Sequence, residues 1–413
     1  MRTFVQFALT VSLAAALLVA CGGSQQPLGP PGGIPQSNAI ALSSSPSYQI
    51  IYSFRGSPDG DGPEANLIDV KGVLYGTTEQ GGAKRTNAGT VFSVSTGGME
   101  HVIYRFSRPR GKFPVAGLID VSGTLYGTTM LGGTGTGASG TVFSISTTGQ
   151  EQQLHSFTGH SDGLRPTASL VDVSGTLYGT TRYGGSYCES SSLGCGTVFS
   201  ITRGGTEKVL HSFGSGSDGL KPAASLIDVN GTLYGTTELG GTYGGGTVFS
   251  VSTSGAEHVL YSFGGTSADG TGPAASLIDV NGTLYGTTLD GGAGPCQGYT
   301  RRVGCGAVFT ITTSGTEKVL YSFGTRSDYD GEQPSASLTD VNGTLYGTTE
   351  LGGTYGDGTI FSVSTSGTEQ IVHSFSGSDG RYPGAGMIDV NGTLYGTAGG
   401  GPHGSGTVFA LTP

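Results

Sequence analysis

The chain repeats one short sequence seven times. The string Leu-Tyr-Gly-Thr recurs at intervals of 51, 52, 56, 51, 61 and 49 residues. Its copies begin at Leu74, Leu125, Leu177, Leu233, Leu284, Leu345 and Leu394. A period of about fifty residues is typical of repeat architectures, in which each copy is one supersecondary unit that buries its apolar face only against neighbouring copies. The repeat therefore constrains the fold more than any local pattern does.

Each copy predicts four short β-strands. In the fourth copy, four runs of β-branched and aromatic residues are separated by turn residues. These runs are 226–229, 233–236, 246–252 and 258–263. Asn230-Gly231 joins the first two, and Asn-Gly between apolar runs is the strongest short signal for a hairpin. Four antiparallel strands in this order form one blade of a β-propeller.

The two ends of the repeat region complement each other. Residues 49–54 match a fourth strand with no first three before it, and residues 406–411 match a third strand with no fourth after it. A linear solenoid would need capping repeats, and none is recognisable. We therefore predict an all-β, seven-bladed β-propeller of four-stranded antiparallel blades, closed by the N-terminal strand as the outer strand of the last blade.

Strand parity assigns the connections to two rims. The first-to-second and third-to-fourth turns are short and nearly identical between copies, and antiparallel pairing puts them on one rim. The second-to-third loops and the crossovers between blades then share the other rim, where length, charge and cysteines vary. Function in repeat folds sits on loops that a rigid scaffold holds, so this variable rim is the predicted ligand face.

The first twenty residues resemble an export signal. Arg2 gives a positive start, 4–17 is mostly apolar but too short to span a bilayer, and the run ends in Leu18-Val19-Ala20-Cys21. This ending resembles the lipobox of bacterial lipoproteins, which implies that Cys21 becomes the lipidated N-terminus; an ordinary secretory peptide with a chance cysteine is the alternative. By the same resemblance, Gly22 after the cysteine favours the outer membrane or cell surface of a bacterium.

The predicted organisation is therefore a signal peptide over 1–20, a flexible tether over 21–47 and a propeller over 48–413. The tether is rich in Gly, Pro and Ser and has no apolar period. Through the lipid on Cys21, the membrane is the first predicted partner of the protein.

Composition limits the remaining partners. Gly accounts for 79 of 413 residues without a Gly-X-Y period, which fits many tight turns rather than collagen. Charged residues make up 12% and the formal net charge is −10, so no basic face is predicted and no nucleic-acid partner is expected. Trp is absent, which weakens a sugar-binding interpretation.

The four remaining cysteines form two close pairs. Cys188 with Cys195, and Cys296 with Cys305, fall in the same loop of two different copies. Two loop-stapling disulfides in an oxidising compartment are the natural interpretation. A structural zinc site would need both pairs to converge, yet they lie two blades apart.

The repeat resembles a known group of bacterial extracellular proteins. Gly-Thr-Leu-Tyr-Gly-Thr-Thr, then Gly-Gly, then Gly-Thr-Val-Phe is similar to the GloVer tandem repeat, with small departures such as Ala307, Ile360 and Ala398. The resemblance covers 48–413 and implies surface anchoring, here by a lipid. No activity is attached to the group, so the resemblance supplies no catalytic residues. The double glycine is also similar to kelch repeats, but the kelch tryptophan is missing.

Residues present in every copy are predicted to serve the scaffold. The seven aspartates of the first strands are Asp69, Asp120, Asp172, Asp228, Asp279, Asp340 and Asp389. Pairing across the hairpin places each opposite the Leu of Leu-Tyr-Gly, partly buried, where it must accept hydrogen bonds. A ring of carboxylates that binds cations in the channel is the alternative. Asp59-Gly60-Asp61-Gly62 and Asp328-Tyr329-Asp330-Gly331 suggest calcium loops, but both lack the later glutamate of an EF-hand, and chance is favoured.

Exposed residues that occur once are the candidate ligand-binding set. They are Arg182, Tyr183, Tyr187, Tyr299, Arg301 and Arg302. No Ser-His-Asp arrangement and no metal spacing recurs, so no catalytic residue, metal or cofactor is predicted. We expect a monomeric surface module that binds a polysaccharide, peptide or protein. A propeller enzyme such as a lyase or glycosidase, and a purely structural envelope protein, remain the alternatives.

Overall fold

The computed structural model describes residues 46–134, 139–186, 188, 193–294, 296, 304–325 and 330–413. The predicted signal peptide, Cys21 and nearly all of the tether lie outside these residues. Residues 44–413 form one compact unit. No helix in the described part of the chain is long and apolar enough to cross a membrane.

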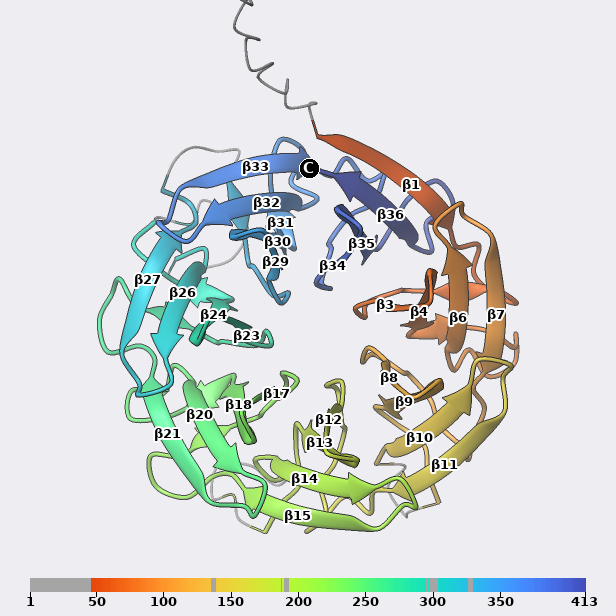
Figure 1. Cartoon of the computed structure of the whole chain (residues 1–413), viewed down its shortest axis with the longest axis horizontal. Coiled ribbons are helices and arrows are strands. Elements are labelled where there is room, and N and C mark those ends of the chain that lie inside the picture. The colour runs from red at the N-terminus through yellow and green to blue at the C-terminus, as the bar shows by residue number, and fades with distance from the viewer. Residues whose placement is uncertain are drawn as a thin grey trace, which may run out of the picture. The chain divides into compact units, whose positions relative to one another are not determined.

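The repeat region folds into seven four-stranded antiparallel blades around a central axis (Figure 1). Blade 1 contains β3(Ile68–Val70), β4(Val73–Thr78), β6(Thr90–Ser95) and β7(Glu100–Arg105), and blade 2 contains β8(Ile119–Val121), β9(Thr124–Thr129), β10(Thr141–Ser146) and β11(Glu151–Ser156). Blade 3 contains β12(Val171–Val173), β13(Thr176–Thr181), β14(Thr197–Thr202) and β15(Glu207–Ser212), and blade 4 contains β17(Ile227–Val229), β18(Thr232–Thr237), β20(Thr247–Ser252) and β21(Glu257–Ser262). Blade 5 contains β23(Ile278–Val280), β24(Thr283–Thr288), β26(Ala307–Thr312) and β27(Glu317–Ser322), and blade 6 contains β29(Thr339–Val341), β30(Thr344–Thr349), β32(Thr359–Ser364) and β33(Glu369–Ser374). Blade 7 contains β34(Ile388–Val390), β35(Thr393–Ala398), β36(Thr407–Thr412) and, as its outer strand, β1(Ser47–Ser53).

The ring closes as the sequence predicts. β1 pairs antiparallel with β36, in a register that sets Tyr48 opposite Leu411 and Ser53 opposite Thr407. The first and last strands therefore complete one blade together, which removes two unpaired edges. The predicted fold class is confirmed.

A threonine hydroxyl links each blade to the next. The penultimate residue of each second strand is a threonine whose hydroxyl donates to an alanine carbonyl that precedes the first strand of the following blade. The seven pairs are Thr77–Ala116, Thr128–Ala168, Thr180–Ala224, Thr236–Ala275, Thr287–Ala336, Thr348–Ala385 and Thr397–Ala65. These groups are buried, so each bond satisfies a hydroxyl and a carbonyl that would otherwise be costly to remove from water.

The hydrophobic core lies at the seams between blades. In each seam the phenylalanine that follows a fourth strand packs edge-on against the third-strand phenylalanine of the next blade, as Phe213 does on Phe249 with ring centroids 5.0 Å apart. The glycine of Leu-Tyr-Gly makes this packing possible. A Cβ on Gly235 would lie 2.7 Å from Phe249 and 2.8 Å from Leu226. Glycine therefore leaves room within blade 4 for the Phe249 ring and the Leu226 side chain, which both pack into the seam core.

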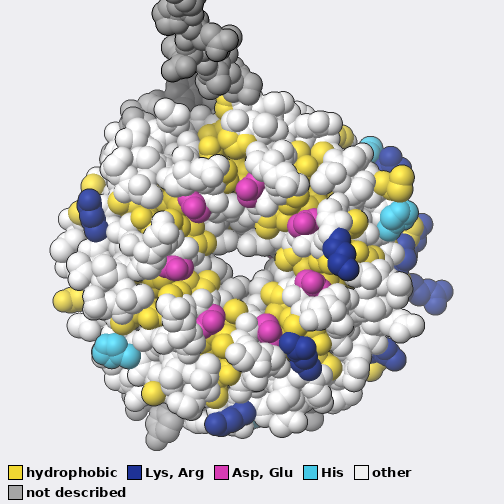
Figure 2. Space-filling view, in the orientation of Figure 1, with side chains coloured by type: hydrophobic (Ala, Val, Ile, Leu, Met, Phe, Trp, Pro, Cys, Tyr) yellow, Lys and Arg dark blue, Asp and Glu magenta, His cyan; other side chains and the backbone are white. Residues whose placement is uncertain are grey.

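The first-strand aspartates have a local structural role. Asp228 pairs opposite Leu233, as predicted, and its Oδ1 accepts a 2.8 Å hydrogen bond from the Gly231 N–H in the hairpin. The same bond occurs at Asp69, Asp120, Asp279, Asp340 and Asp389. The prediction of partial burial is wrong for all except Asp172, because these side chains lie on the open inner edge of each hairpin. Figure 2 shows acidic side chains around the channel.

The variable loops pair with one another on one rim, here named the loop face. Short ribbons join the crossover before a blade to the second-to-third loop of that blade, as β16(Gly219–Leu220) does with β19(Leu239–Gly240). The equivalent ribbons are β2(Gly60–Asp61) with β5(Gln80–Gly81), β22(Gly270–Thr271) with β25(Asp290–Gly291), and β28(Gly331–Glu332) with β31(Leu351–Gly352). The crossovers and the variable loops therefore share a rim, as strand parity predicts.

Candidate functional site

Two of the six candidate residues can be placed on the loop face. Arg182 and Tyr183 follow β13 and begin the second-to-third loop of blade 3. Tyr187, Tyr299, Arg301 and Arg302 lie outside the described residues. Arg182 and Tyr183 are half-buried rather than fully exposed.

The backbone around Tyr183 is held from two sides. The Tyr183 N–H donates to the Leu164 carbonyl at 3.0 Å, which ties the loop to the crossover that enters blade 3. The Tyr183 carbonyl accepts a 2.8 Å bond from the Thr181 hydroxyl. The position of Tyr183 is therefore set by a scaffold of hydrogen bonds.

Three cationic side chains surround the Tyr183 ring. The guanidinium of Arg165 lies 5.6 Å from the ring centroid, that of Arg182 lies 5.9 Å away, and the Lys221 ammonium lies 5.9 Å away. All three distances are within the range of cation–π attraction. Arg165 comes from the crossover into blade 3 and Lys221 from the crossover into blade 4, so the group joins three separate segments.

Glu238 partly neutralises this group. Arg182 Nη2 donates to Glu238 Oε2 at 2.7 Å, while the buried Nε of Arg182 has no hydrogen-bond partner among the described residues. We name Arg165, Arg182, Tyr183, Lys221 and Glu238 the Tyr183 cluster. With three cations and one anion it carries a formal charge of +2, in a chain whose net charge is −10. Such a cluster attracts anions.

The residue before the crossover proline adopts a left-handed backbone in every blade. Arg165 has φ 56° and Lys221 has φ 57°, and the remaining members are Gly62, Phe113, Gly272, Gln333 and Tyr382. For a residue other than Gly this conformation costs about 1–2 kcal/mol. Blades 1 and 5 avoid the cost with glycine, whereas five blades keep a large side chain that differs each time. Backbone strain that is retained where glycine would remove it indicates that the side chains before the crossover prolines have a functional role.

The residue before the crossover proline was not identified from the sequence as part of a binding site. The signal that could have found it is the residue before Pro166, Pro222 and their equivalents, which changes in nearly every copy while the proline does not. The sequence of a single copy does not show that the side chain before the proline, such as Arg165 or Lys221, reaches Tyr183 in the second-to-third loop of blade 3.

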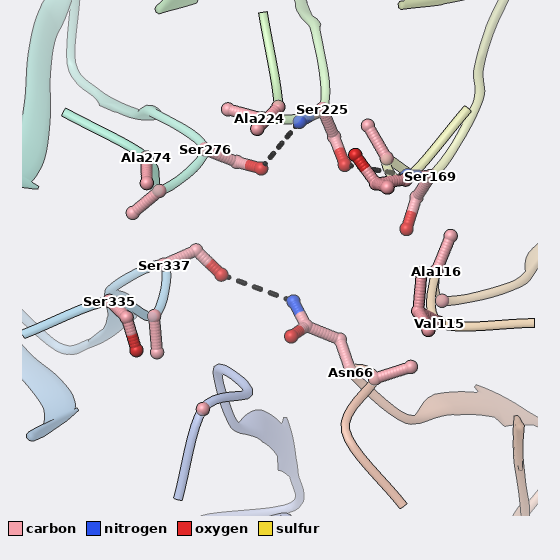
Figure 3. A pocket seen from close by; sticks show the side chains of 18 of the residues that line it. Asn66, Val115, Ala116, Ser169, Ala224, Ser225, Ala274, Ser276, Ser335 and Ser337 are labelled. Atoms are coloured by element: carbon pink, nitrogen blue, oxygen red, sulfur yellow. Dashed lines mark hydrogen bonds between the residues drawn. The ribbon is translucent and has the colours of Figure 1, made fainter. Parts of the chain in front are cut away.

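The axial channel is narrow and lined by small side chains. Its cavity of about 110 Å³ is surrounded by the Ala and Ser residues that precede the first strands (Figure 3). Ser225 Oγ accepts from the Ser169 N–H at 2.9 Å, and Ser276 Oγ accepts from the Ser225 N–H at 3.0 Å. Opposite them, Asn66 Nδ2 donates to Ser337 Oγ at 3.1 Å. The channel walls thus satisfy much of their own polarity, and the space fits only small molecules or a few waters.

An acidic cavity opens beside the channel mouth. Glu64, Glu350, Arg381 and Tyr382 contribute to the lining of a cavity of about 430 Å³. Glu64 is exposed to solvent, and partial desolvation by the surrounding protein, together with the carboxylates of Glu79 and Glu350, raises its pKa to about 7. Glu64 occupies a position that is apolar, Thr, Ser or Gly in the other blades, so it is a non-repeated acid that the sequence comparison overlooked.

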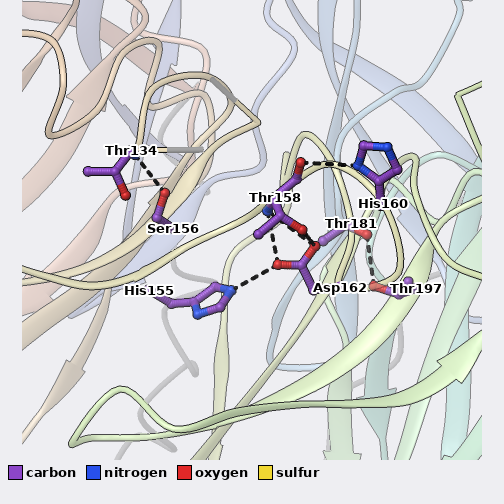
Figure 4. Close-up of polar contacts among 8 residues, drawn as sticks. All are labelled: Thr134, His155, Ser156, Thr158, His160, Asp162, Thr181 and Thr197. Atoms are coloured by element: carbon purple, nitrogen blue, oxygen red, sulfur yellow. Dashed lines mark hydrogen bonds and ion pairs between the residues drawn. The ribbon is translucent and has the colours of Figure 1, made fainter. Parts of the chain in front are cut away.

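The crossover aspartates organise their own loops. Figure 4 shows Asp162, which accepts from the Thr158 N–H and hydroxyl and lies 3.5 Å from His155 Nε2. Burial by itself would raise the pKa of Asp162, but the nearby His155 and the hydrogen bonds from Thr158 lower it to about 2. Asp59 likewise accepts from the Tyr52 hydroxyl and from two backbone N–H groups. Its role is explained without a calcium ion; Asp328 and Tyr329 lie outside the described residues.

Both predicted disulfides form. Cys188 bonds to Cys195, and Cys296 bonds to Cys305. They lie in the second-to-third loops of blades 3 and 5, on the loop face. Structural disulfides indicate an oxidising, extracellular environment.

A protein-family model matches almost the whole repeat region. The Gloeobacter/Verrucomicrobia repeat matches residues 39–192 and 187–409. The chain belongs to this repeat family. The seven blades described above are thus the fold of this member of the Gloeobacter/Verrucomicrobia repeat family. None of the curated proteins matches it in sequence.

Solved structures share the fold of this family member at low identity. The lectin BP39L from Burkholderia pseudomallei aligns with a TM-score of 0.57 and 9% identity, over 87% of this chain and 97% of the lectin. A puromycin hydrolase aligns with a TM-score of 0.52 and 12% identity, over 82% of this chain and 50% of the hydrolase. A gluconolactonase from Xanthomonas campestris reaches 0.40 at 10% identity, over 88% of this chain and 89% of that chain. The likenesses to the lectin and the hydrolase concern architecture alone, and a shared propeller fold does not by itself assign a function.

Proposed function

We propose that this protein is an exported surface module that binds an acidic ligand, foremost an anionic polysaccharide, through the Tyr183 cluster. The observation that carries the proposal is the convergence of Arg165, Arg182 and Lys221 on one tyrosine ring. A carboxylated or sulfated sugar offers anionic groups to the cations and C–H faces to the ring.

Several features support a binding role. Two of the cations occupy strained backbone positions. The disulfides brace loops of the same face. A lipid on Cys21 would tether the module to the bacterial envelope.

The test is a binding titration with polygalacturonate as the acidic probe and dextran as the neutral one. We expect the mature chain to bind polygalacturonate more tightly than dextran, and an Arg165→Ala/Lys221→Ala variant to lose about tenfold or more, since 1.4 kcal/mol corresponds to tenfold in affinity. The matched control is Lys208→Ala/Lys318→Ala, which removes the same charge from exposed positions on the outer strands. Equal losses in the two variants would reduce the interaction to overall charge and contradict the proposal.

An enzymatic function is the second candidate, because one observation favours it. Glu64, with its raised pKa, shares a cavity with Glu350, Arg381 and Tyr382. A protonated carboxyl beside a carboxylate is the arrangement that general acid and base chemistry requires. Release of new reducing ends from polygalacturonate, lost in a Glu64→Gln variant, would support this function.

A further inference from the structure

A polar triad recurs at the outer edge of the seams and shares no residue with the Tyr183 cluster. Each complete triad contains a Tyr or His near the end of a fourth strand, an aspartate in the following crossover and the first glutamate of the next fourth strand. Between blades 3 and 4 the members are His211, Asp218 and Glu257, which we name the His211 triad. Between blades 4 and 5 they are Tyr261, Asp269 and Glu317.

The His211 triad brings three metal-ligating groups together. His211 Nε2 lies 3.0 Å from Asp218 Oδ2, and one ligand atom from each of the three residues lies within 4.8 Å of the others. The Asp218 side chain is only 8% exposed. A second group of this kind among the described residues consists of Cys296, Cys305 and Glu332, but its sulfurs form a disulfide.

A buried glutamate oxygen without a partner among the described residues recurs at these seams, at Glu100, Glu151, Glu207 and Glu317 as well as at Glu257. The glutamate of the His211 triad is Glu257. Its Oε1 is buried and has no hydrogen-bond partner in the described part of the chain. A buried carboxylate oxygen without a partner is costly. Two carboxyl groups beside a histidine therefore share a site that a divalent cation would neutralise.

The seam between blades 4 and 5, here named the tyrosine seam, has Tyr261 in the place of His211 and allows a direct comparison. In that seam the Tyr261 hydroxyl donates to Asp269 Oδ2 at 3.1 Å, and Glu317 Oε1 is again buried without a partner among the described residues. Burial raises the pKa of the Tyr261 phenol, so it stays protonated and offers no ligand lone pair of the kind that a neutral imidazole presents. The two seams thus differ mainly in the presence of a nitrogen ligand.

Neither of the two other histidine seams gathers three ligand atoms within 4.8 Å of one another among the described residues. The seam of His155 has the same residue types, with Asp162 and Glu207, but not this spacing. Both oxygens of Asp162 accept hydrogen bonds from Thr158, and its distance from His155 is 3.5 Å. In the seam of His373, the place of the glutamate is taken by Tyr48, which pairs with Leu411 as Glu100 pairs with Val94. One site per chain is therefore expected.

We propose that His211, Asp218 and Glu257 bind one first-row transition-metal ion, with Zn²⁺ as the first choice, across the seam between blades 3 and 4. One imidazole nitrogen and two carboxylate oxygens form a ligand set that Zn²⁺ accepts at about 2.0–2.2 Å, with water in the fourth position. Imidazole disfavours Ca²⁺ and Mg²⁺, which prefer oxygen ligands. The ion would join two blades and stabilise the ring.

The experiment uses the untagged mature chain after treatment with a chelator. Titration with Zn²⁺ is expected to give one binding event per chain and a higher Tm, because a ligand that binds only the folded state stabilises it. Co²⁺ should give the visible absorption of a four-coordinate site. A His211→Tyr variant, which copies the tyrosine seam, should unfold at the wild-type Tm without metal and bind Zn²⁺ on the order of 100-fold more weakly, since loss of even an outer-shell partner costs 10–100-fold.

Two matched variants keep the result unambiguous. His155→Tyr removes a histidine from the neighbouring seam and should leave the affinity and the stoichiometry unchanged. Tyr261→His supplies the missing nitrogen next to Asp269 and Glu317 and should raise the stoichiometry from one ion to two. Equal Zn²⁺ binding by the wild type and His211→Tyr, or the absence of a Zn²⁺-dependent rise in Tm, would overturn the proposal. Polygalacturonate binding should be the same with and without Zn²⁺, which separates this site from the Tyr183 cluster.

Discussion

Tyr48 stacks on His373, with ring centroids 3.9 Å apart and an interplanar angle of 3°. The Tyr48 hydroxyl also donates to the Asp379 carbonyl at 2.7 Å. The first described strand and the outer strand of blade 6 thus meet at the point where the ring closes. Tyr48 occupies the position that carries glutamate in the other fourth strands. At the closing seam an aromatic stack therefore stands where the other seams have a carboxyl group.

Tyr48→Ala should destabilise the propeller by about 2–4 kcal/mol, because it removes a packed aromatic ring at the closing seam. Tyr48→Phe keeps the ring and loses only the hydroxyl bond, so it should cost about 1 kcal/mol. Urea unfolding followed by tyrosine fluorescence measures both. Tyr243→Ala is the control, because that side chain is 62% exposed and its removal should change stability little. Similar effects of Tyr48→Ala and Tyr243→Ala would show that closure does not depend on this stack.

Stability should fall as the pH rises from about 4.5 to 7. Burial is the main cause that raises the pKa of Glu100, Glu257 and Glu317 to about 7 and that of Glu207 to about 6, from an ordinary 4.5. The folded state therefore holds protons that the unfolded state releases over this range, so the stabilisation is complete below about 4.5 and lost by about 7. Thermal unfolding between pH 4 and 8 should show this decline in Tm. A variant with Gln at all four positions should show a smaller decline, to which Glu64 still contributes, and an unchanged slope in that variant would contradict the assignment.

Gly235→Ala should cost about 1–3 kcal/mol, since a Cβ there would meet Phe249 at 2.7 Å and displace its ring from the seam core. Gly97→Ala is the matched control, because the nearest atom to its Cβ would be Ser95 Oγ at 3.8 Å. We expect that control to stay within about 0.5 kcal/mol of the wild type in denaturant unfolding. Equal costs at the two sites would mean that the glycine serves backbone conformation rather than packing.

Lys221→Gly should stabilise the fold while weakening the binding of polygalacturonate. Its φ of 57° is strained for lysine and free for glycine, which occupies the same position at Gly62 and Gly272. Removing the strain should add about 1 kcal/mol, reduced by the greater entropy of glycine in the unfolded chain. Lys221→Ala separates the two effects, because it loses the charge and keeps the strain. If Lys221→Gly lowers stability, then the left-handed backbone at Lys221 does not destabilise the fold, and its proposed retention for binding is contradicted.

Much of the architecture could be predicted because it depends on local and repeated signals. Asn230-Gly231 specifies a hairpin by its own backbone preferences, and seven similar copies identify the four strands of every blade. The match between the first and last strands predicted the pairing of β1 with β36. The burial of the first-strand aspartates was predicted wrongly, because alternation along a strand does not show which inner edges remain open to solvent.

The candidate site could be predicted only in part. Arg182 and Tyr183 were recognisable as residues that occur once in a variable loop. Arg165 and Lys221 were not, because each stands in a different crossover and looks like an ordinary surface cation in its own copy. The raised pKa of Glu64 could not be predicted for a similar reason, since the neighbouring carboxylates of Glu79 and Glu350 come from two different blades.

The sequence by itself determined the number of blades, the order of strands, the closing strand and the rim on which the variable loops gather. These properties follow from periodicity and turn chemistry, which act over a few residues and repeat around the ring. Only the tertiary structure decided which side chains meet. Three cations converge on Tyr183, and His211 meets Asp218 and Glu257, because adjacent blades pack at close quarters and the residue before each crossover proline turns its side chain through a left-handed backbone.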